Sequence, residues 1–108
     1  MRETSSQMRK GTVELAILTL LARRDYYGGE LVNALAEYHG LDSSSGTVYP
    51  ILKRLAKARH LSTRWEESPA GPPRKYYTLT DSGRKHLHSL TANWHALQAA
   101  LNAILSKD

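Results

Sequence analysis

The sequence predicts a mainly α-helical domain with one small β-hairpin, an α+β arrangement that continues into a long C-terminal helix. Three patterns in its 108 residues support this fold class. Apolar residues recur at helical spacing in three segments before residue 60, and the period then changes from 3.6 to 2. After residue 80 the apolar residues follow a heptad repeat. A chain of this length fits one compact domain.

The first helix is predicted from Lys10 to Arg23. Residues 1–8 before it are polar and show no period, so we expect a disordered N-terminal segment there. The helix carries apolar residues on more than one face, and a helix that is apolar on most sides must be covered on most sides. In a chain this short, we expect a second subunit to supply part of that cover.

Two further helices are expected in the first half of the chain. Asp25–Gly29 is rich in turn residues and is predicted to separate the first helix from the second. The second helix is predicted from Gly29 to Tyr38, because its apolar residues face one side and Gly40 is a natural stop.

The third helix is predicted from Ser45 to Arg59, after a short turn rich in capping residues. Its apolar positions form one stripe, made of Val48, Ile51, Leu52 and Leu55. Other residues lie at helical spacing on a second face, namely Thr47, Pro50, Arg54 and Lys57. The third helix therefore presents a partly basic face to solvent.

A β-hairpin is predicted from Leu61 to Leu79, around the breaker at 68–73. Its basic residues are Arg64, Arg74 and Lys75. Its aromatic residues are Trp65, Tyr76 and Tyr77. These rings are candidates for a base-stacking platform of the kind found in single-strand binders. On a two-stranded hairpin, packing of the rings against the body is the favoured interpretation.

The last helix is predicted from Thr80, a plausible N-cap, to Ser106. Apolar residues follow one another at spacings of 3, 4, 3, 4 and 3 along it: Leu87, Leu90, Trp94, Leu97, Leu101 and Ile104. At 1.5 Å per residue the helix is about 40 Å long, which is longer than this domain can cover. The sequence therefore predicts a homodimer that is held together along this seam.

The composition narrows the class of partner. Fifteen Lys and Arg residues against ten Asp and Glu give a net charge of +5, which favours a polyanionic partner. The absence of cysteine excludes disulfides and thiolate zinc sites. The longest apolar run, Leu15 to Ala22, is far shorter than the roughly 20 residues that span a bilayer. We expect a cytoplasmic protein that does not interact with membranes.

The histidines offer neither a metal site nor a catalytic site by their spacing. His86 and His88 point in different directions on a helix, and His88 and His95 are too far apart to share one metal ion. His39 and His60 lie in turns. Solvent-exposed histidines are the favoured interpretation. We expect no enzymatic activity, no metal and no cofactor.

Several motifs resemble one known family. Gly46–Leu55, with the sequence GTVYPILKRL, resembles the recognition-helix motif of the PadR family of transcriptional regulators. Gly71–Thr80, with the sequence GPPRKYYTLT, resembles the family's wing, and Gly83 matches its closing glycine. Tyr27-Gly28 matches the pair that precedes the second helix. The similarity covers about residues 8–105. The single terminal helix resembles the smaller subgroup, which includes multidrug-sensing regulators.

The resemblance implies a winged helix-turn-helix DNA-binding domain over residues 9–79 and a dimerisation helix over residues 80–108. It implies a transcriptional regulator, and we expect a dimeric repressor on a pseudopalindromic operator in double-stranded DNA. It also implies that Tyr49 and Lys53 contact DNA, with Arg74 and Lys75 reaching the adjacent minor groove or backbone.

Further contacts are expected where the third helix begins. The N-terminus of a helix suits phosphate, because its free N–H groups and its dipole are positive there. Ser44, Ser45 and Thr47 supply short donors at this end, and Arg54 adds charge. Capping by Ser44 or Ser45 and simple solvation of the basic face are the alternative interpretations, and capping is compatible with DNA contact.

Two positions depart from the family pattern. The family often has an aromatic residue after Tyr27-Gly28, where this chain has Gly29. The family usually places glycine after the recognition helix, where this chain has Arg59 followed by His60. An arginine in the left-handed conformation costs roughly 1 kcal/mol, or else the turn has a different geometry.

Trp94 suggests a ligand site. The resemblance to multidrug-sensing members implies that two copies of Trp94 could sandwich a planar hydrophobic effector across the dimer axis, with Leu15 and Leu18 as lining residues. An ordinary seam tryptophan is the alternative. For the chain as a whole, the alternatives are a winged-helix protein–protein adaptor that has lost DNA binding and a protein with only a ligand pocket at its dimer interface.

Overall fold

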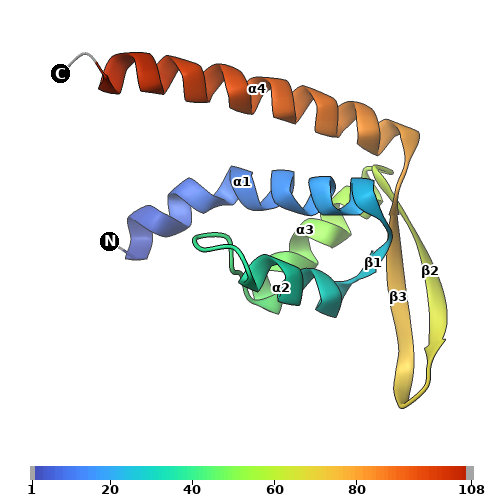
Figure 1. The fold of residues 1–108 in the computed structure, drawn as a ribbon. Helices are drawn as coiled ribbons and strands as arrows, with labels where there is room; N and C mark the ends of the chain where they lie inside the picture. Colours follow the sequence, from blue (N-terminus) through green and yellow to red (C-terminus); the bar gives the residue numbers. More distant parts are fainter. Residues whose placement is uncertain (1, 107–108) are drawn as a thin grey trace.

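The computed structural model describes the backbone of residues 2–106 and the side chains of residues 11–106. Over those residues the chain forms four helices and one three-stranded antiparallel sheet (Figure 1). The helices are α1 (Arg2–Arg23), α2 (Gly28–Ala36), α3 (Ser45–Lys57) and α4 (Asp81–Leu105). The strands are β1 (Tyr26–Tyr27), β2 (Leu61–Ser68) and β3 (Gly71–Leu79). The predicted fold class is confirmed.

Helix α1 occupies the middle of the molecule, with α4 along one side of it and α2 and α3 on the other (Figure 1). Ile17 and Leu18 of α1 are completely buried. The predicted start of this helix at Lys10 was wrong, because α1 begins at Arg2, inside the segment expected to be disordered. No proline or glycine interrupts residues 2–10, and extending an existing helix adds one hydrogen bond for each residue ordered.

A strand replaces part of the predicted turn at Asp25–Gly29. Tyr26 and Tyr27 form β1, which pairs with Tyr77 and Tyr76 of β3. The strand order is therefore β1-β3-β2, and the predicted hairpin has a third strand along one edge. Two residues are too few to show an alternating pattern, so the sequence carried no periodic signal for this strand.

The hairpin of β2 and β3 projects away from the helices (Figure 1). Leu61 pairs with Leu79 at its base, and Trp65 lies opposite Lys75 farther out. The base is buried and the outer half is exposed. The hairpin therefore presents its outer side chains to solvent from an anchored base.

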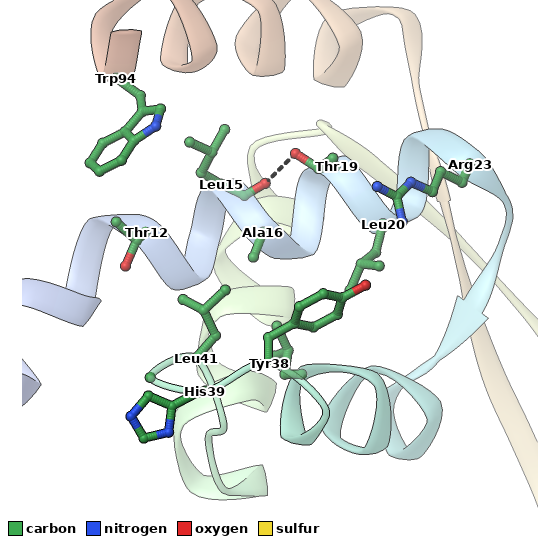
Figure 2. Close-up of a pocket in the computed structure, with 12 residues that line it drawn as sticks. Thr12, Leu15, Ala16, Thr19, Leu20, Arg23, Tyr38, His39, Leu41 and Trp94 are labelled. Carbon is green, nitrogen blue, oxygen red and sulfur yellow. Dashed lines mark hydrogen bonds between the residues drawn. The ribbon is translucent and has the colours of Figure 1, made fainter. Parts of the chain in front are cut away.

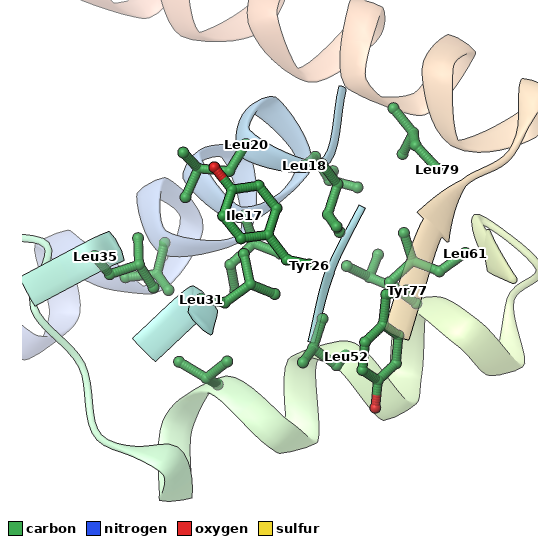
Figure 3. Close-up of a cluster of buried hydrophobic side chains, with 14 residues drawn as sticks. Ile17, Leu18, Leu20, Tyr26, Leu31, Leu35, Leu52, Leu61, Tyr77 and Leu79 are labelled. Carbon is green, nitrogen blue, oxygen red and sulfur yellow. The ribbon is translucent and has the colours of Figure 1, made fainter. Parts of the chain in front are cut away.

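One hydrophobic core joins the helices to the base of the sheet (Figure 3). Its members come from α1, α2, α3 and all three strands. They are Val13, Ile17, Leu18, Leu20, Leu21, Tyr26, Leu31, Leu35, Val48, Leu52, Leu55, Leu61, Tyr77 and Leu79. Because α3 and the hairpin share this core, their relative placement is set by packing.

The start of α4 is held tightly. The side chain of Thr80 is the N-cap, as predicted, and accepts a hydrogen bond from the Gly83 N–H at 3.0 Å. A Cβ atom at Gly83 would lie 2.1 Å from the carbonyl oxygen of His60, so only glycine allows this approach. Leu87 and Leu90 then pack against the core. Beyond them α4 carries exposed apolar side chains.

The turn after α3 has the left-handed geometry that the family pattern suggested. Arg59 has a φ of 66°. The Arg59 N–H donates to the Ala56 carbonyl at 3.0 Å, and the His60 N–H donates to the Leu55 carbonyl at 2.9 Å. This is a Schellman motif, which normally has glycine at the left-handed position. The sequence left two alternatives, an arginine in the left-handed conformation or a turn of different geometry. The φ of Arg59 confirms the first.

None of the helices, over the part of the chain that is described, combines the length and the apolarity needed to cross a membrane.

Replacing Arg59 with glycine should stabilise the fold. Arg59→Gly removes the steric cost of a side chain at positive φ and should raise the free energy of unfolding by about 1 kcal/mol, as measured by urea denaturation. Ala58→Gly is the matched control, since Ala58 has a φ of −78° and glycine there should lower stability. If the Arg59→Gly variant is no more stable than the wild type, the left-handed conformation of Arg59 does not destabilise the fold.

Candidate functional site

The N-terminal end of α3 is open to solvent. Ser44 occupies the N-cap position, but its side chain makes no capping hydrogen bond. Ser45, Thr47 and Lys53 are also exposed. The interpretation of Ser44 as a simple side-chain cap is therefore not supported. The three hydroxyls and one ammonium group face outward from one helix.

Tyr49 lies on α3 directly against the start of α2. A Cβ atom at Gly28 would lie 2.3 Å from Cε1 of Tyr49, so the tyrosine ring packs on a backbone that has no side chain. Tyr49 nevertheless remains 45% exposed. Burial raises the pKa of the neighbouring Tyr77 hydroxyl, with a smaller contribution from Tyr49. The sequence analysis identified Gly28 only as part of the Tyr27-Gly28 motif. The structure shows that the absence of a side chain at Gly28 makes room for the Tyr49 ring.

Arg54 differs from the other candidate residues on α3, because its guanidinium is hydrogen-bonded to the Glu14 carboxylate of α1. The other oxygen of Glu14 lies 3.1 Å from Nε2 of His86 on α4. One carboxylate therefore links α1, α3 and α4. No spacing in the sequence indicates this contact, since the residues are 40 and 72 positions apart.

The environment of Glu14 favours its charged form. Burial alone would raise the pKa of this carboxyl, but hydrogen bonds and charge from Arg54 and His86 outweigh burial and lower the pKa. The Glu14 side chain is only 15% exposed, so solvent screens the interaction less than it would at an open surface. The ionised carboxylate contributes to stability.

The prediction that the histidines are solvent-exposed was wrong for two of them. His60 and His86 are half-buried, and their rings stack with centroids 4.4 Å apart and planes inclined by 4°. Nδ1 of His60 also lies 2.8 Å from the Ser82 hydroxyl. Packing of α4 over the turn after α3 brings them together, which local spacing cannot predict. Among residues 11–106, no three His, Asp or Glu side chains are arranged to share a metal ion.

The cations of the hairpin fall into two groups. Arg64 is hydrogen-bonded to Asp25 and, at 2.8 Å, to Glu66, and these two partners raise its pKa. Arg74 lies over the Tyr27 ring at 4.6 Å, and Lys75 lies 5.8 Å from the Trp65 ring. Within the described residues, neither Arg74 nor Lys75 has a carboxylate partner. Glu66 lies opposite Arg74 in the strand register, but its carboxylate is hydrogen-bonded to Arg64, so neither Arg74 nor Lys75 is held in an ion pair there.

The aromatic residues of the hairpin also fall into two groups, those packed against the body and one that is exposed. Tyr77 is buried, and Tyr76 packs edge-on against Tyr27 with ring centroids 5.4 Å apart, so packing against the body is confirmed for both. The same prediction was wrong for Trp65, which is 67% exposed. The strand continues beyond the body at Trp65, and no other element covers it.

A groove of about 440 Å³ separates α3 from the hairpin. It is lined by Tyr27, Gly28, Tyr49, Trp65, Pro73, Arg74, Lys75 and Tyr77. Of the predicted site residues, Tyr49 of α3 and Arg74 and Lys75 of the wing therefore meet at this groove. The others do not line it, and they are Ser44, Ser45, Thr47, Lys53 and Arg54.

A second, mainly apolar pocket of about 470 Å³ lies between α1, α4 and the loop after α2 (Figure 2). Trp94 and Leu15 line it together on one side, and Tyr38, His39 and Leu41 lie on the other. The prediction for Leu18 was wrong. That side chain is completely buried in the core and does not line the pocket.

The predicted seam on α4 divides at Trp94. Leu87 and Leu90 are partly buried against the core of the same chain. The remaining residues are 40–68% exposed, and they are Trp94, Leu97, Leu101 and Ile104. Leu105, which the heptad pattern did not include, is 70% exposed.

Known proteins share this architecture. Residues 17–89 match the Transcriptional regulator PadR-like family. A PadR family transcriptional regulator from Eggerthella lenta is 33% identical, with 99% of this chain and 93% of that chain covered and a TM-score of 0.87. A PadR-like transcription factor from Bacteroides fragilis is 42% identical over 94% of this chain and 98% of that chain, with a TM-score of 0.76. A PadR-like transcriptional regulator from Bacillus cereus is 33% identical over 92% and 96%, with a TM-score of 0.81.

Replacing Glu14 should destabilise the fold in a pH-dependent way. Glu14→Gln should lower the free energy of unfolding by about 1 kcal/mol at pH 7, because the paired charge is lost. A carboxyl with a lowered pKa stabilises the fold above its unfolded value near 4.5, and this contribution disappears as the pH falls through the lower folded pKa. The difference between variant and wild type, measured by urea denaturation, should therefore close below pH 4.5.

The exposed Glu67 provides the control, since Glu67→Gln should have little effect at either pH. A Glu14→Gln effect that is equally large at pH 7 and pH 3 would show that charge pairing is not its cause.

Proposed function

The chain belongs to the PadR-like family of transcriptional regulators, and from that premise we propose that it is a dimeric repressor that binds double-stranded DNA. A small planar hydrophobic effector releases it from its operator. Residues 9–79 form the DNA-binding domain, and residues 80–108 form the dimerisation helix. One observation supports the proposal: the exposed Lys53 lies one helical turn from the exposed Tyr49 on α3, and Tyr49 lines one groove with the exposed Arg74 and Lys75 of the wing.

Helix α3 suits the major groove, which admits a single helix. Ser44, Ser45 and Thr47 present hydroxyl groups at its N-terminal end, where the helix dipole favours phosphate. Tyr49 and Lys53 extend the contact along the helix. The wing residues Arg74 and Lys75 reach the adjacent minor groove or backbone.

Arg54 contributes less to DNA binding than its position on α3 indicates. Its guanidinium is already paired with Glu14, so binding a phosphate would compete with an existing ion pair. Arg54 mainly anchors α3 to α1. Its remaining exposure allows a weaker, longer-range attraction to DNA.

The dimer forms along the exposed part of α4. Leu97, Leu101 and Ile104 recur at spacings of four and three, which places them on one side of the helix. A row of exposed leucine and isoleucine side chains favours burial against a copy of the same helix. Two recognition helices can then enter successive major grooves of a pseudopalindromic operator, about 34–36 Å apart.

The pocket beside Trp94 takes the effector. Its volume of about 470 Å³ lies within the range of small-molecule sites, and most of its lining is apolar. Because Leu15 and Trp94 come from α1 and α4, a planar ligand between them binds one relative placement of these helices better than another. Effector binding thereby changes the angle between the arms and the spacing of the two α3 helices.

A winged-helix adaptor without DNA binding is the alternative function. An adaptor would be expected to expose apolar residues on α3, whereas Thr47, Lys53 and Lys57 are exposed there. A repressor of this kind acts in the cytoplasm and needs no catalytic group, metal or cofactor.

Removing a cation from α3 or from the wing should weaken DNA binding. Lys53→Ala and Arg74→Ala should each reduce affinity for a duplex selected from genomic fragments by about tenfold at 100 mM salt. Each should also reduce the slope of log K against log salt by about one, because one phosphate contact is lost. Fluorescence anisotropy at several salt concentrations measures both quantities.

Lys85→Ala is the matched control, since Lys85 is an exposed lysine near the start of α4 that does not line the groove between α3 and the wing. Both site variants should unfold within about 0.5 kcal/mol of the wild type. Affinity changes below twofold for both would refute this site, and a salt-independent wild type would favour the adaptor.

Trp94 should report effector binding directly. Acridine, a planar aromatic probe, should quench tryptophan emission of the wild type by stacking on the Trp94 indole. Trp94→Leu should lose most of this quenching, because Trp65 lies outside the pocket. Titration of both proteins without DNA separates the two tryptophans. Equal quenching in the variant would rule out Trp94 as the effector contact.

A further inference from the structure

We propose that the groove between α3 and the hairpin holds one strand of the DNA duplex, and that Trp65 packs against its deoxyribose. Lys75, which lies opposite Trp65 in the strand register, binds a phosphate next to that sugar, and Arg74, the preceding residue of β3, adds positive charge at the groove. The inference rests on the proposed function and deepens it, because it assigns a DNA-contacting role to an apolar residue of the wing.

The exposure of Trp65 is the first observation. The indole is 67% exposed on β2, whereas the two rings of the neighbouring strand β3, Tyr76 and Tyr77, are covered by the body. Leaving a large apolar ring in water sacrifices the stabilisation that burial would provide. An exposed tryptophan at a fixed position in a strand is therefore suited to an external partner.

The surroundings of Trp65 define the chemistry of that partner. Lys75 lies directly opposite Trp65 in the register, and its Nζ is 5.8 Å from the indole ring. Arg74 is held over the Tyr27 ring at 4.6 Å. No described residue that lines the groove carries a carboxylate, whereas two carry positive charges. The groove therefore favours an anionic partner that also offers an apolar face.

A nucleic-acid backbone has this alternation of charge and apolar surface. Each deoxyribose presents a carbon-rich face, and each is flanked by two phosphates. The groove is also continuous with the exposed side of α3, because Tyr49 is a residue of α3 and lines the groove. A strand whose bases face α3 can therefore pass along the groove with its sugars against Trp65.

The structure favours a duplex over single-stranded nucleic acid. Proteins that bind single strands stack successive bases on several exposed rings. On this hairpin only Trp65 is open, since Tyr77 is buried and Tyr76 packs edge-on against Tyr27. A single exposed ring beside two cations fits one sugar of a strand whose bases remain paired.

A sugar contact carries no sequence information, and this sets the experiment apart from tests of base recognition. Trp65→Ala should lower affinity for the selected operator and for an unrelated duplex by the same factor, about tenfold. The slope of log K against log salt should not change in Trp65→Ala, because no charge is removed. Lys75→Ala should instead reduce the slope by about one.

Trp65→Phe and Ser62→Ala complete the set of variants. The phenylalanine keeps an apolar ring and should restore binding to within about threefold of the wild type. Ser62 is an exposed residue of the same strand outside the groove, so Ser62→Ala should bind as the wild type does. Circular dichroism and urea denaturation show whether each variant is folded.

A second measurement detects the contact itself. Protein labelled with 5-fluorotryptophan gives a ¹⁹F NMR signal for each of its two tryptophans, and Trp65→Phe identifies the signal of Trp65. That signal should shift when duplex DNA is added. Single-stranded DNA of the same sequence should bind more weakly and leave the signal closer to its free position.

The outcomes separate this inference from the proposed function. If the wild type binds duplex DNA but Trp65→Ala binds within twofold of it and the Trp65 signal does not move, the inference fails and the proposed function stands. An effect confined to the operator would place Trp65 against a base and also overturn the sugar contact. Equal or stronger binding of single strands would overturn the duplex assignment. A wild type that binds no duplex refutes both.

Discussion

The central constraint in this molecule is that α1 is apolar on most of its sides, and those sides must be covered. Helices α2 and α3, the base of the sheet and the first turns of α4 supply that cover. Leu87 and Leu90 are the last seam residues of α4 that reach the core. From Trp94 onward α4 carries apolar side chains that this chain alone leaves exposed. The need to bury α1 thus explains both the compact body and the exposed arm.

A carboxylate of α1, that of Glu14, connects these parts. Glu14 binds Arg54 of α3 and His86 of α4, and His86 stacks on His60 at the base of the hairpin. A change in the position of α4 therefore alters contacts that also position α3 and the wing. Meanwhile Arg54 and Arg64 have carboxylate partners, whereas the positive charges at Lys53 and Arg74 point outward. This division of charge supports the proposed DNA contact at the α3–wing surface.

Sequence periodicity predicted the elements that bury a stripe or an alternating face. The Val48–Leu55 stripe, the hairpin and the Thr80 cap all agree with the structure. Strand β1 escaped prediction because two residues show no period, and the early start of α1 escaped because polar residues can extend an existing helix.

The candidate site was predicted in part, because motifs identify residues on α3 and the wing but not their partners. The Glu14–Arg54 pair, the stacked histidines and the exposure of Trp65 all arise where distant segments meet. Leu18 was misplaced for the same reason, since residues on an all-round apolar helix cannot be assigned to one neighbour from spacing alone. Tertiary contacts of this kind are decided by the packing of whole elements.

The account depends most directly on pairing of the chain through the exposed half of α4. Sedimentation equilibrium of the purified chain at micromolar concentration measures this pairing. It should give a dimer for the wild type, a folded monomer for Leu101→Glu, and a dimer for Gln98→Glu, which adds the same charge on the same helix. A wild type that is monomeric at micromolar concentration would contradict the account.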